Sequence, residues 1–232
     1  MQSSKQPLIT GNKWLITIPV MLAALIAVLD ASIVNVAIPN MQSSFGAGVD
    51  EIDWVITGYL ISNVIIIPTT GWFSSTFGLK RYFAISQIVF VIASFLCGIS
   101  WNLPSLVFFR VLQGIGGGAI LPVALTILLE AFPPRELAMA SALFGVGAAL
   151  GPAIGPTLGG WLTDTLSWQW IFFVNVPIVA VSVVLSQLLI QENREANAQR
   201  RSAPIDFLGF ATVAIWLGTM QVVLQEGQKD GW

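Results

Sequence analysis

Two charged residues lie inside long apolar runs, and they are the clearest candidates for chemistry in this sequence. Asp30 lies eight residues before the end of the run Trp14–Ile38, and Arg110 lies five residues after the start of the run Ser105–Leu129. If both runs are helices that cross a membrane in opposite directions, a rise of about 1.5 Å per residue places the two charges at similar depths. Because buried opposite charges neutralise each other, we expect Asp30 and Arg110 to face a shared interior.

Two interpretations of this pair stay open at the level of sequence. In the first, the pair is a buried salt bridge that only fixes the register of two helices. In the second, Asp30 is a titratable group whose protonation changes when water or substrate reaches it, and the pair couples proton movement to transport.

Polar and small residues near Arg110 predict a binding cavity. Gln113, Gly114 and Gly117 continue the Arg110 face at helical spacing, so we expect them to form a polar, open-sided wall. Tyr59 and Asn63 are four residues apart on another apolar run. They either line the same cavity or form hydrogen bonds that join helices.

Glycines recur every four residues in the stretch GVGAALGPAIGPTLGG, from Gly145 to Gly160. This period places them on one helix face, against which another backbone can lie closely. Two prolines in the same stretch remove backbone donors and favour bending. The segment is therefore either a tight helix crossing or a bendable helix at a moving interface. Its expected conformational residues are Gly147, Gly151, Pro152, Gly155, Pro156, Gly159 and Gly160.

Composition identifies the class of protein that must position these residues. Hydrophobic residues make up 55% of the 232 residues and charged residues 9%, whereas a soluble domain contains roughly 25% charged residues. The chain is therefore predicted to be an integral membrane protein in contact with the lipid bilayer. The chain has a single cysteine, Cys97, and no histidine. This excludes disulfides within the chain, metal sites built from cysteine or histidine, and catalysis by histidine. We expect no cofactor and no nucleic-acid partner.

Seven apolar runs are long enough to cross a hydrocarbon core of about 30 Å. They are expected at Trp14–Ile38, Trp54–Ser74, Tyr82–Ser100, Ser105–Leu129, Ala138–Leu162, Ile171–Ile190 and Phe207–Gln225. The prediction divides the chain into a six-helix unit at 1–190, a cytoplasmic loop at 191–205, and a seventh helix with an extracytoplasmic tail at 206–232. Gln191–Ser202 is expected to be mostly solvated.

Basic residues predict the orientation of these spans. If the seven spans alternate, eight of the ten lysines and arginines fall on one side, which places the N-terminus in the cytoplasm and the C-terminus outside. Tryptophans at predicted span ends, including Trp168, are typical of an interfacial belt. Glu130 ends the fourth span on the cytoplasmic side, within reach of Arg135 or of the Lys80–Arg81 pair.

Several segments together resemble the major facilitator superfamily, and specifically its fourteen-helix drug:proton antiporters such as the Emr-type inner-membrane pumps. The resemblance rests on Leu29–Pro39, Gly71–Arg81, Phe108–Gly118, Gly145–Gly160 and Trp168–Ile178. It implies an all-α membrane fold in which six helices form an N-terminal half with a 3+3 inverted repeat, followed by one extra helix. It places Asp30 and Arg110 in the first- and fourth-helix motifs.

The resemblance also implies a function and partners. The expected function is proton-coupled efflux of amphipathic drugs or toxic compounds across the inner membrane, with a periplasmic adaptor and an outer-membrane channel as possible partners. Ser75 stands where the loop signature usually carries an acidic residue. Glu130 is therefore expected to complete a cytoplasmic latch with Gly71, Gly78, Lys80 and Arg81.

Such transporters have a second six-helix half, which we expect to be absent from this chain. The alternative interpretation is a truncated fragment that does not transport without a complementary half. A membrane enzyme is disfavoured, because no constellation of nucleophile and base is present.

Overall fold

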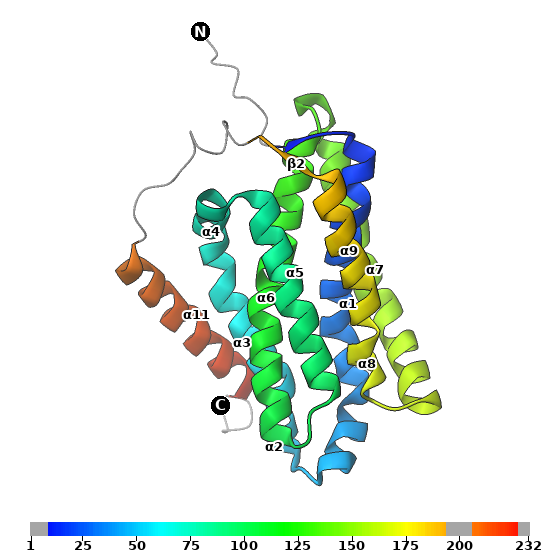
Figure 1. The fold of residues 1–232 in the computed structure, drawn as a ribbon. Coiled ribbons are helices and arrows are strands. Elements are labelled where there is room, and N and C mark those ends of the chain that lie inside the picture. Colours follow the sequence, from blue (N-terminus) through cyan, green and yellow to red (C-terminus); the bar gives the residue numbers. More distant parts are fainter. Residues whose placement is uncertain (1–8, 194–205, 227–232) are drawn as a thin grey trace.

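The computed structural model of the chain describes residues 9–193 and 206–226, and these residues are predominantly helical (Figure 1). Within them, seven helices or runs of consecutive helical segments are long and apolar enough to cross a membrane. This confirms the seven predicted spans, most of which extend a few residues beyond their apolar runs. The uninterrupted ones are α1 (Lys13–Phe45), α5 (Leu79–Gly98), α6 (Leu103–Ala131), α7 (Leu137–Thr165) and α11 (Phe207–Glu226).

The other two spans are interrupted, and a proline lies at or near a break in each. The second span consists of α2 (Val49–Ile52), α3 (Trp54–Ile66), the 3-10 helix η1 (Ile67–Thr69) and α4 (Thr70–Phe77). Pro68 lies in η1 and removes a backbone donor there. The sixth span consists of α8 (Trp170–Phe173) and α9 (Asn175–Leu189). Pro177 in α9 cannot donate to the carbonyl four residues earlier and crowds it, so the helix is broken at Val174.

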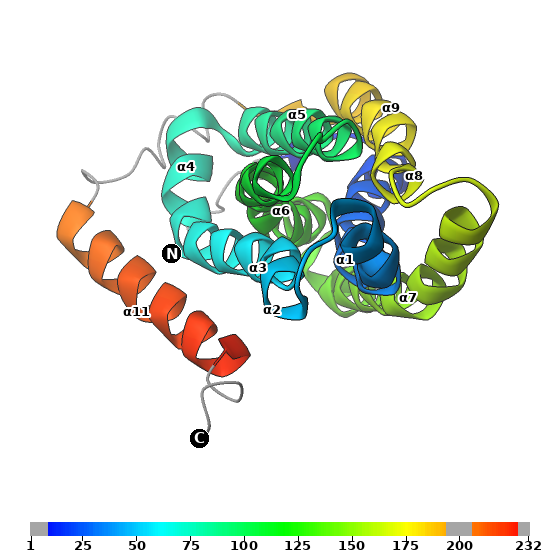
Figure 2. The same ribbon diagram turned by 90° about the horizontal axis from the view of Figure 1, so that it is seen from below.

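Six spans form a bundle in which α6 occupies an inner position between α1, α3 and α5 (Figure 2). Helices α7 and α9 pack against α1, while α11 lies outside the bundle and contacts α3 and η1. Glycines let α6 lie this deep. A Cβ added at Gly116 would lie 2.6 Å from the backbone nitrogen of Phe90, and one added at Gly118 would lie 2.7 Å from the carbonyl oxygen of Asn63.

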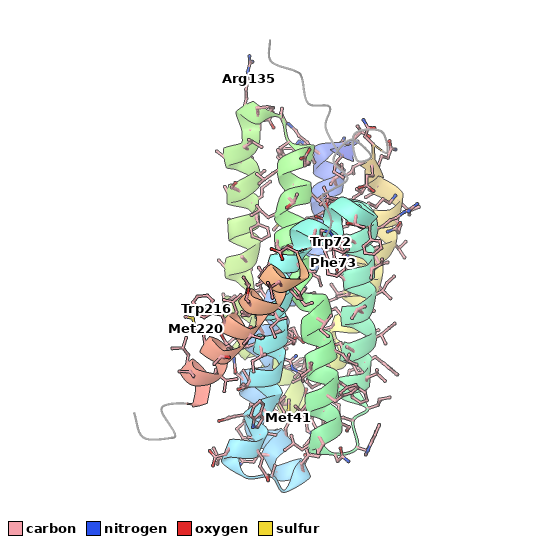
Figure 3. The ribbon with its side chains drawn as sticks, turned by 90° about the vertical axis from the view of Figure 1, so that its left-hand side faces the viewer. Met41, Trp72, Phe73, Arg135, Trp216 and Met220 are labelled. Carbon is pink, nitrogen blue, oxygen red and sulfur yellow. The ribbon has the colours of Figure 1, made fainter. Side chains whose placement is uncertain are left out.

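The basic ends of the spans gather at one end of the bundle, as alternating spans require. Lys13 forms an ion pair with Glu136 of η2 (Pro134–Glu136), and Arg135 lies at the same end (Figure 3). Lys80 Nζ donates to the carbonyl oxygen of Gln187 at 2.7 Å, which joins the start of α5 to the end of α9. Which side of the membrane this end faces stays a prediction.

A short strand pair at this end was not predicted from the sequence. Strand β1 (Ile9–Thr10) pairs antiparallel with β2 (Gln191–Glu192), at the start of the segment expected to be mostly solvated. Glu192 Oε1 accepts from the backbone nitrogen of Leu79 at 2.7 Å. Partial burial raises the pKa of Glu192, although this hydrogen bond opposes the shift. The rest of the predicted loop, 194–205, and the predicted tail, 227–232, lie outside the described residues.

One tryptophan departs from the predicted interfacial belt. Trp14, Trp54, Trp101 and Trp161 are exposed at span ends, as expected, but Trp168 is buried inside the protein. Its ring packs edge-on against Phe45 at 5.4 Å, and its Nε1 donates to Ser44 Oγ at 3.1 Å. Because a side chain from α1 satisfies its N–H, Trp168 does not need the membrane surface. Trp216 and Met220 of α11 are exposed (Figure 3).

Candidate functional site

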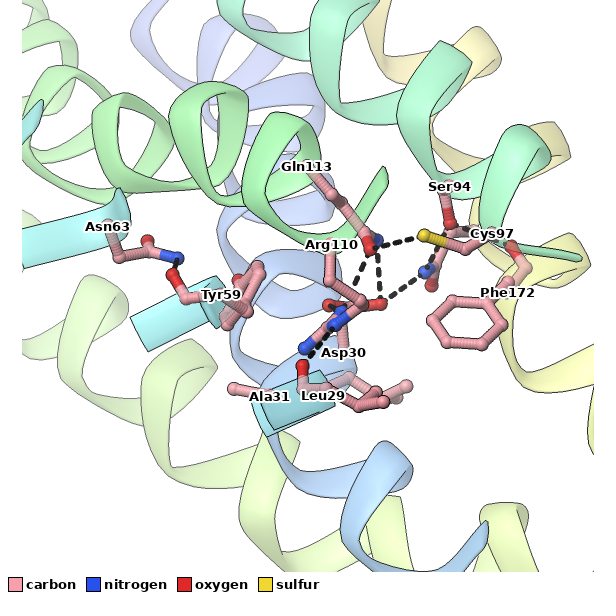
Figure 4. Close-up of polar contacts among 12 residues, drawn as sticks. Leu29, Asp30, Ala31, Tyr59, Asn63, Ser94, Cys97, Arg110, Gln113 and Phe172 are labelled. Carbon is pink, nitrogen blue, oxygen red and sulfur yellow. Dashed lines mark hydrogen bonds and ion pairs between the residues drawn. The ribbon is translucent and has the colours of Figure 1, made fainter. Parts of the chain in front are cut away.

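Asp30 and Arg110 meet in the interior of the bundle, as the depth argument predicted. Arg110 Nη1 lies 2.7 Å from Asp30 Oδ2, and the two residues are 1% and 0% exposed (Figure 4). Asp30 lies on α1 and Arg110 on α6, so the ion pair joins two spans that run in opposite directions. An ion pair this deep is tolerated only when further hydrogen bonds satisfy both partners.

Two amide side chains supply those bonds to Asp30. Asp30 Oδ1 accepts from Gln113 Nε2 at 2.9 Å and from Asn175 Nδ2 at 2.7 Å. Together with Arg110, three donors therefore converge on one carboxyl group. An ionised carboxylate only accepts hydrogen bonds, so this arrangement is that of the charged form of Asp30.

Arg110 is also held by groups other than Asp30. Its Nε donates to the carbonyl oxygen of Val55 at 3.1 Å, and its Nη1 donates to Gln113 Oε1 at 2.8 Å. The guanidinium carbon lies 4.0 Å from the centre of the Tyr59 ring and 5.7 Å from that of Phe172. Aromatic faces stabilise a cation in this position, so Tyr59 contributes to the site by stacking on the arginine.

A second layer connects this network to α5 and α8. Asn175 Nδ2 also donates to Ser94 Oγ at 3.0 Å, and Ser94 Oγ donates to the carbonyl oxygen of Phe172 at 2.9 Å. Cys97 Sγ lies 3.6 Å from Gln113 Oε1. Asn175, Ser94 and Cys97 were not assigned to the site from the sequence. The available signal was their polarity within apolar spans, but a single sequence does not show which of them face Asp30.

The predicted open wall beside Arg110 is covered in this structure. A Cβ added at Gly114 would lie 2.5 Å from the carbonyl oxygen of Tyr59, and one added at Gly117 would lie 3.0 Å from the Tyr59 hydroxyl. Asn63 Nδ2 donates to the Tyr59 carbonyl oxygen at 3.0 Å within its own helix. The small residues of α6 thus serve the close approach of α3, and a cavity lined by these residues stays a prediction.

The four glycines of α7 that recur every fourth residue form one buried face, as predicted, and that face lies against α1. A Cβ added at Gly151 would lie 2.7 Å from Val28 Cγ1 and 2.9 Å from the backbone nitrogen of Leu29. Gly155 and Gly159 meet Ser32 and Ile33 in the same way. The other members of the motif, Pro152, Pro156 and Gly160, lie off this buried face, and a Cβ at Gly160 would meet open space. The close crossing is confirmed, whereas a conformational role stays a prediction.

The structure places several residues of the predicted cytoplasmic latch, and the latch itself stays a prediction. Gly78 joins α4 to α5 with a φ of 91°, a left-handed conformation that favours glycine. Gly71 lies within α4, where an added Cβ would meet open space. Lys80 binds the end of α9 rather than α6. The pairing of Glu130 with Arg81 stays a prediction.

Comparison with known proteins agrees with this geometry. A family model described as Major Facilitator Superfamily matches residues 20–224. The chain is 40% identical over 232 residues to the multidrug export protein EmrB of Escherichia coli (strain K12), and 35% identical over 217 residues to the fatty acid resistance protein FarB of Neisseria gonorrhoeae. These matches cover 100% and 94% of this chain and 44% and 42% of the relatives.

A solved structure shows the same fold at low sequence identity. The human organic anion transporter MFSD10 (TETRAN) superposes with a TM-score of 0.70 at 16% identity, over 92% of this chain and 57% of that protein. The chain spans less than half the length of the curated relatives it matches. The family model matches nearly all of the seven candidate membrane helices, and the fold is shared with a solved structure of similar architecture. The chain is therefore an integral membrane protein that belongs to the major facilitator superfamily.

Proposed function

We propose that this chain forms the N-terminal part of a proton-driven exporter of amphipathic toxic compounds. The observation that carries the proposal is the fully buried Asp30–Arg110 pair at 2.7 Å. A charge at this depth is costly and in membrane transporters usually serves transport. The names of the relatives, which describe multidrug export and fatty acid resistance, favour amphipathic substrates over sugars or ions.

Proton binding to Asp30 would change the strength of the contact between α1 and α6. While Asp30 is ionised, it neutralises the buried charge of Arg110. A proton on Asp30 removes that neutralisation and leaves Arg110 with Gln113, Val55 and Tyr59 as partners. Two states that differ in the proton affinity of one site are what a proton gradient needs to do work.

Helix α1 can pass this change to α7, because it carries Asp30 on one side and meets the glycine face on the other. Gly151, Gly155 and Gly159 place the two backbones close together without interlocking side chains. When α1 shifts, it would therefore slide along α7. We propose that this motion opens the predicted substrate cavity beside Gln113, Gly114 and Gly117, with Tyr59 and Asn63 on its far side.

Topology and partners follow from the same proposal. The basic residues at one end of the bundle support a cytoplasmic N-terminus in an inner membrane, and a reporter fused after Trp232 that is active only outside the cytoplasm would agree. The whole transporter is proposed to use a periplasmic adaptor and an outer-membrane channel. Copurification of an adaptor with the tagged transporter tests this part separately.

Efflux from membrane vesicles at several imposed pH gradients tests the function. The whole transporter should move an amphipathic dye uphill on a proton gradient, and Asp30→Asn should remove the dependence of the rate on that gradient while dye binding remains. Uphill transport by the Asp30→Asn protein would show that the pair is structural and that coupling lies elsewhere.

A further inference from the structure

The two amides that bind Asp30 differ in what their oxygens do. Gln113 uses both ends, because its Nε2 donates to Asp30 and its Oε1 accepts from Arg110 at 2.8 Å. Asn175 Nδ2 donates to Asp30 Oδ1 and to Ser94 Oγ, but Asn175 Oδ1 is buried and has no hydrogen-bond partner among the described residues. An unpartnered buried oxygen is unfavourable, so a second state that uses it would be stabilised.

Protonation of Asp30 creates such a state. When a proton binds Asp30 Oδ1, the new O–H needs an acceptor, yet both amides point N–H donors at that oxygen. Gln113 cannot turn without losing its bond from Arg110. Asn175 can turn about its terminal side-chain torsion, which exchanges Nδ2 and Oδ1 without moving the backbone. The acid would then donate to Asn175 Oδ1.

We propose that Asn175 is a positioning residue whose side-chain amide reverses when Asp30 binds a proton, so that it donates to the carboxylate and accepts from the acid. The inference rests on the proposed function, in which Asp30 is the group that takes up the proton. With Asp30 ionised the amide oxygen of Asn175 is left over, and with Asp30 protonated the reversed amide leaves its N–H group over, so the amide itself favours neither protonation state strongly. Near-balance is what a switch requires.

The reversal would also reach α8 through Ser94. The Ser94 hydroxyl now donates to the carbonyl oxygen of Phe172. After the reversal it faces the oxygen of Asn175 and can donate to that oxygen instead. Phe172 lies two residues before the break between α8 and α9 at Val174. The contact between α5 and α8 would therefore change with the proton, which gives the sixth span a part in coupling.

The groups that titrate or carry charge around Asp30 are few. In the described residues they are Arg110 from α6, Tyr59 from α3 and Cys97 from α5. Helices α8 and α9 contain no titratable residue. A signal from this side of the site can therefore be assigned to the amide of Asn175 and not to a second proton.

Infrared difference spectroscopy of the chain in lipid nanodiscs, between alkaline and acidic buffer, tests the proposal without a transport assay. The acid form of Asp30 gives a carboxyl C=O band that Asp30→Asn should remove. Asn175→Leu should move this band to higher frequency, because the acid loses its acceptor. Asn175→Gln keeps an amide acceptor without adding a carboxyl group and should leave the band at or below its wild-type frequency.

Gln87→Leu is the matched control. Gln87 is a buried amide on α5 whose oxygen also lacks a partner within the described part of the chain, and its Nε2 donates to the Phe83 carbonyl oxygen of the same helix at 3.4 Å. This variant should leave the Asp30 band unchanged. Size-exclusion elution checks that each variant stays folded. If Asn175→Leu does not stay folded, a band of Asn175→Gln above the wild-type frequency overturns the proposal.

The outcomes separate this inference from the proposed function. A wild-type band that Asp30→Asn removes, but that stays at the same frequency in Asn175→Leu, overturns the reversal of Asn175 and leaves Asp30 as the proton site. If no band depends on Asp30, the aspartate does not take up the proton, and both the coupling proposal and this inference fail.

Discussion

Helix α1 is held in different ways on its two sides. On one side, Asp30 accepts three hydrogen bonds from Arg110, Gln113 and Asn175, all of them buried. On the other side, α1 meets the glycine face of α7, and a hydrogen bond there runs from Ser32 Oγ to the carbonyl oxygen of Gly151 at 3.1 Å. The first contact depends on charge and direction, and the second depends on shape.

This difference assigns different tasks to the two sides. Directional bonds to a charged group select one arrangement and lose it when the charge is removed. A smooth face of glycines tolerates small translations, since no side chain has to change rotamer. We therefore expect substitutions on the Asp30 side to change stability and pH dependence, and substitutions on the glycine side to change transport with little effect on pH dependence.

Among the substitutions at α1 and its neighbours, Arg110→Ala should cause the largest loss of stability. It removes the bonds to Asp30, Gln113 and Val55 and the contact with Tyr59, and it leaves a buried carboxylate without its counter-charge. Breaking a buried pair in this way typically destabilises a protein by about 3–5 kcal/mol. Unfolding of the purified chain in detergent measures the loss.

Arg110→Lys is the matched control for charge. It keeps the cation but cannot reproduce the guanidinium fork that reaches Asp30 and Val55 together. Its stability should lie between those of the wild type and Arg110→Ala. Equal stability of Arg110→Ala and the wild type would contradict the view that this side of α1 is held by charge.

Asp30→Asn should have the next largest effect. The amide keeps the shape of the aspartate but removes the negative charge, so Arg110 loses its neutralising partner and Gln113 faces a weaker acceptor. Hydrogen bonds to charged groups are worth about 1.5–3 kcal/mol, and a loss of this size is expected in detergent unfolding.

The sequence predicted the Asp30–Arg110 contact and the common glycine face of α7 because both follow from helix geometry, but it did not identify α1 as the neighbour of that face. The rise per residue fixed the relative depth of Asp30 and Arg110. A period of four residues fixed the common face of Gly151 and Gly155. Neither inference required knowledge of how the other helices of the bundle are arranged.

The predictions failed, or reached no conclusion, where a residue's environment depends on which other helices pack beside its own. Asn175 completes the site because α9 packs beside α1, which spacing along one helix cannot reveal. Gly114 was expected on an open wall, but α3 covers it. The buried position of Trp168 depends on Ser44 from α1. The pairing of β1 with β2 involves two residues on each strand, too few for any periodic pattern.

Gly151→Leu should have a moderate effect on stability and a large one on transport. The new side chain would meet Val28 and the backbone of Leu29, which cannot move aside as a flexible side chain can. Overpacking of this kind costs about 1–3 kcal/mol. Dye efflux by the whole transporter should be lost, while the protein still inserts into the membrane.

Gly145→Leu tests whether the loss is specific to the buried face. Gly145 lies on the same helix, is exposed, and a Cβ there would meet nothing within 4 Å. Its efflux should stay close to wild type. Wild-type efflux in Gly151→Leu as well would mean that α7 does not need to lie close to α1 during transport.

Ser32→Ala should have the smallest effect, and it asks whether the glycine side is held by shape alone. The Ser32 hydroxyl donates to the Leu29 carbonyl oxygen within α1 at 2.9 Å and to the Gly151 carbonyl oxygen across the interface at 3.1 Å. A neutral hydrogen bond contributes about 0.5–1.5 kcal/mol, and the Gly151 carbonyl lies inside a helix, where its own backbone bond persists. The alanine is smaller than serine, so the close approach at Gly155 is kept. Unfolding in detergent should therefore shift by less than about 1 kcal/mol, and both the efflux rate and its pH dependence should match the wild type. A loss of stability as large as that of Asp30→Asn would show that the glycine side is also held by a directional bond, and the contrast between the two sides of α1 would no longer stand.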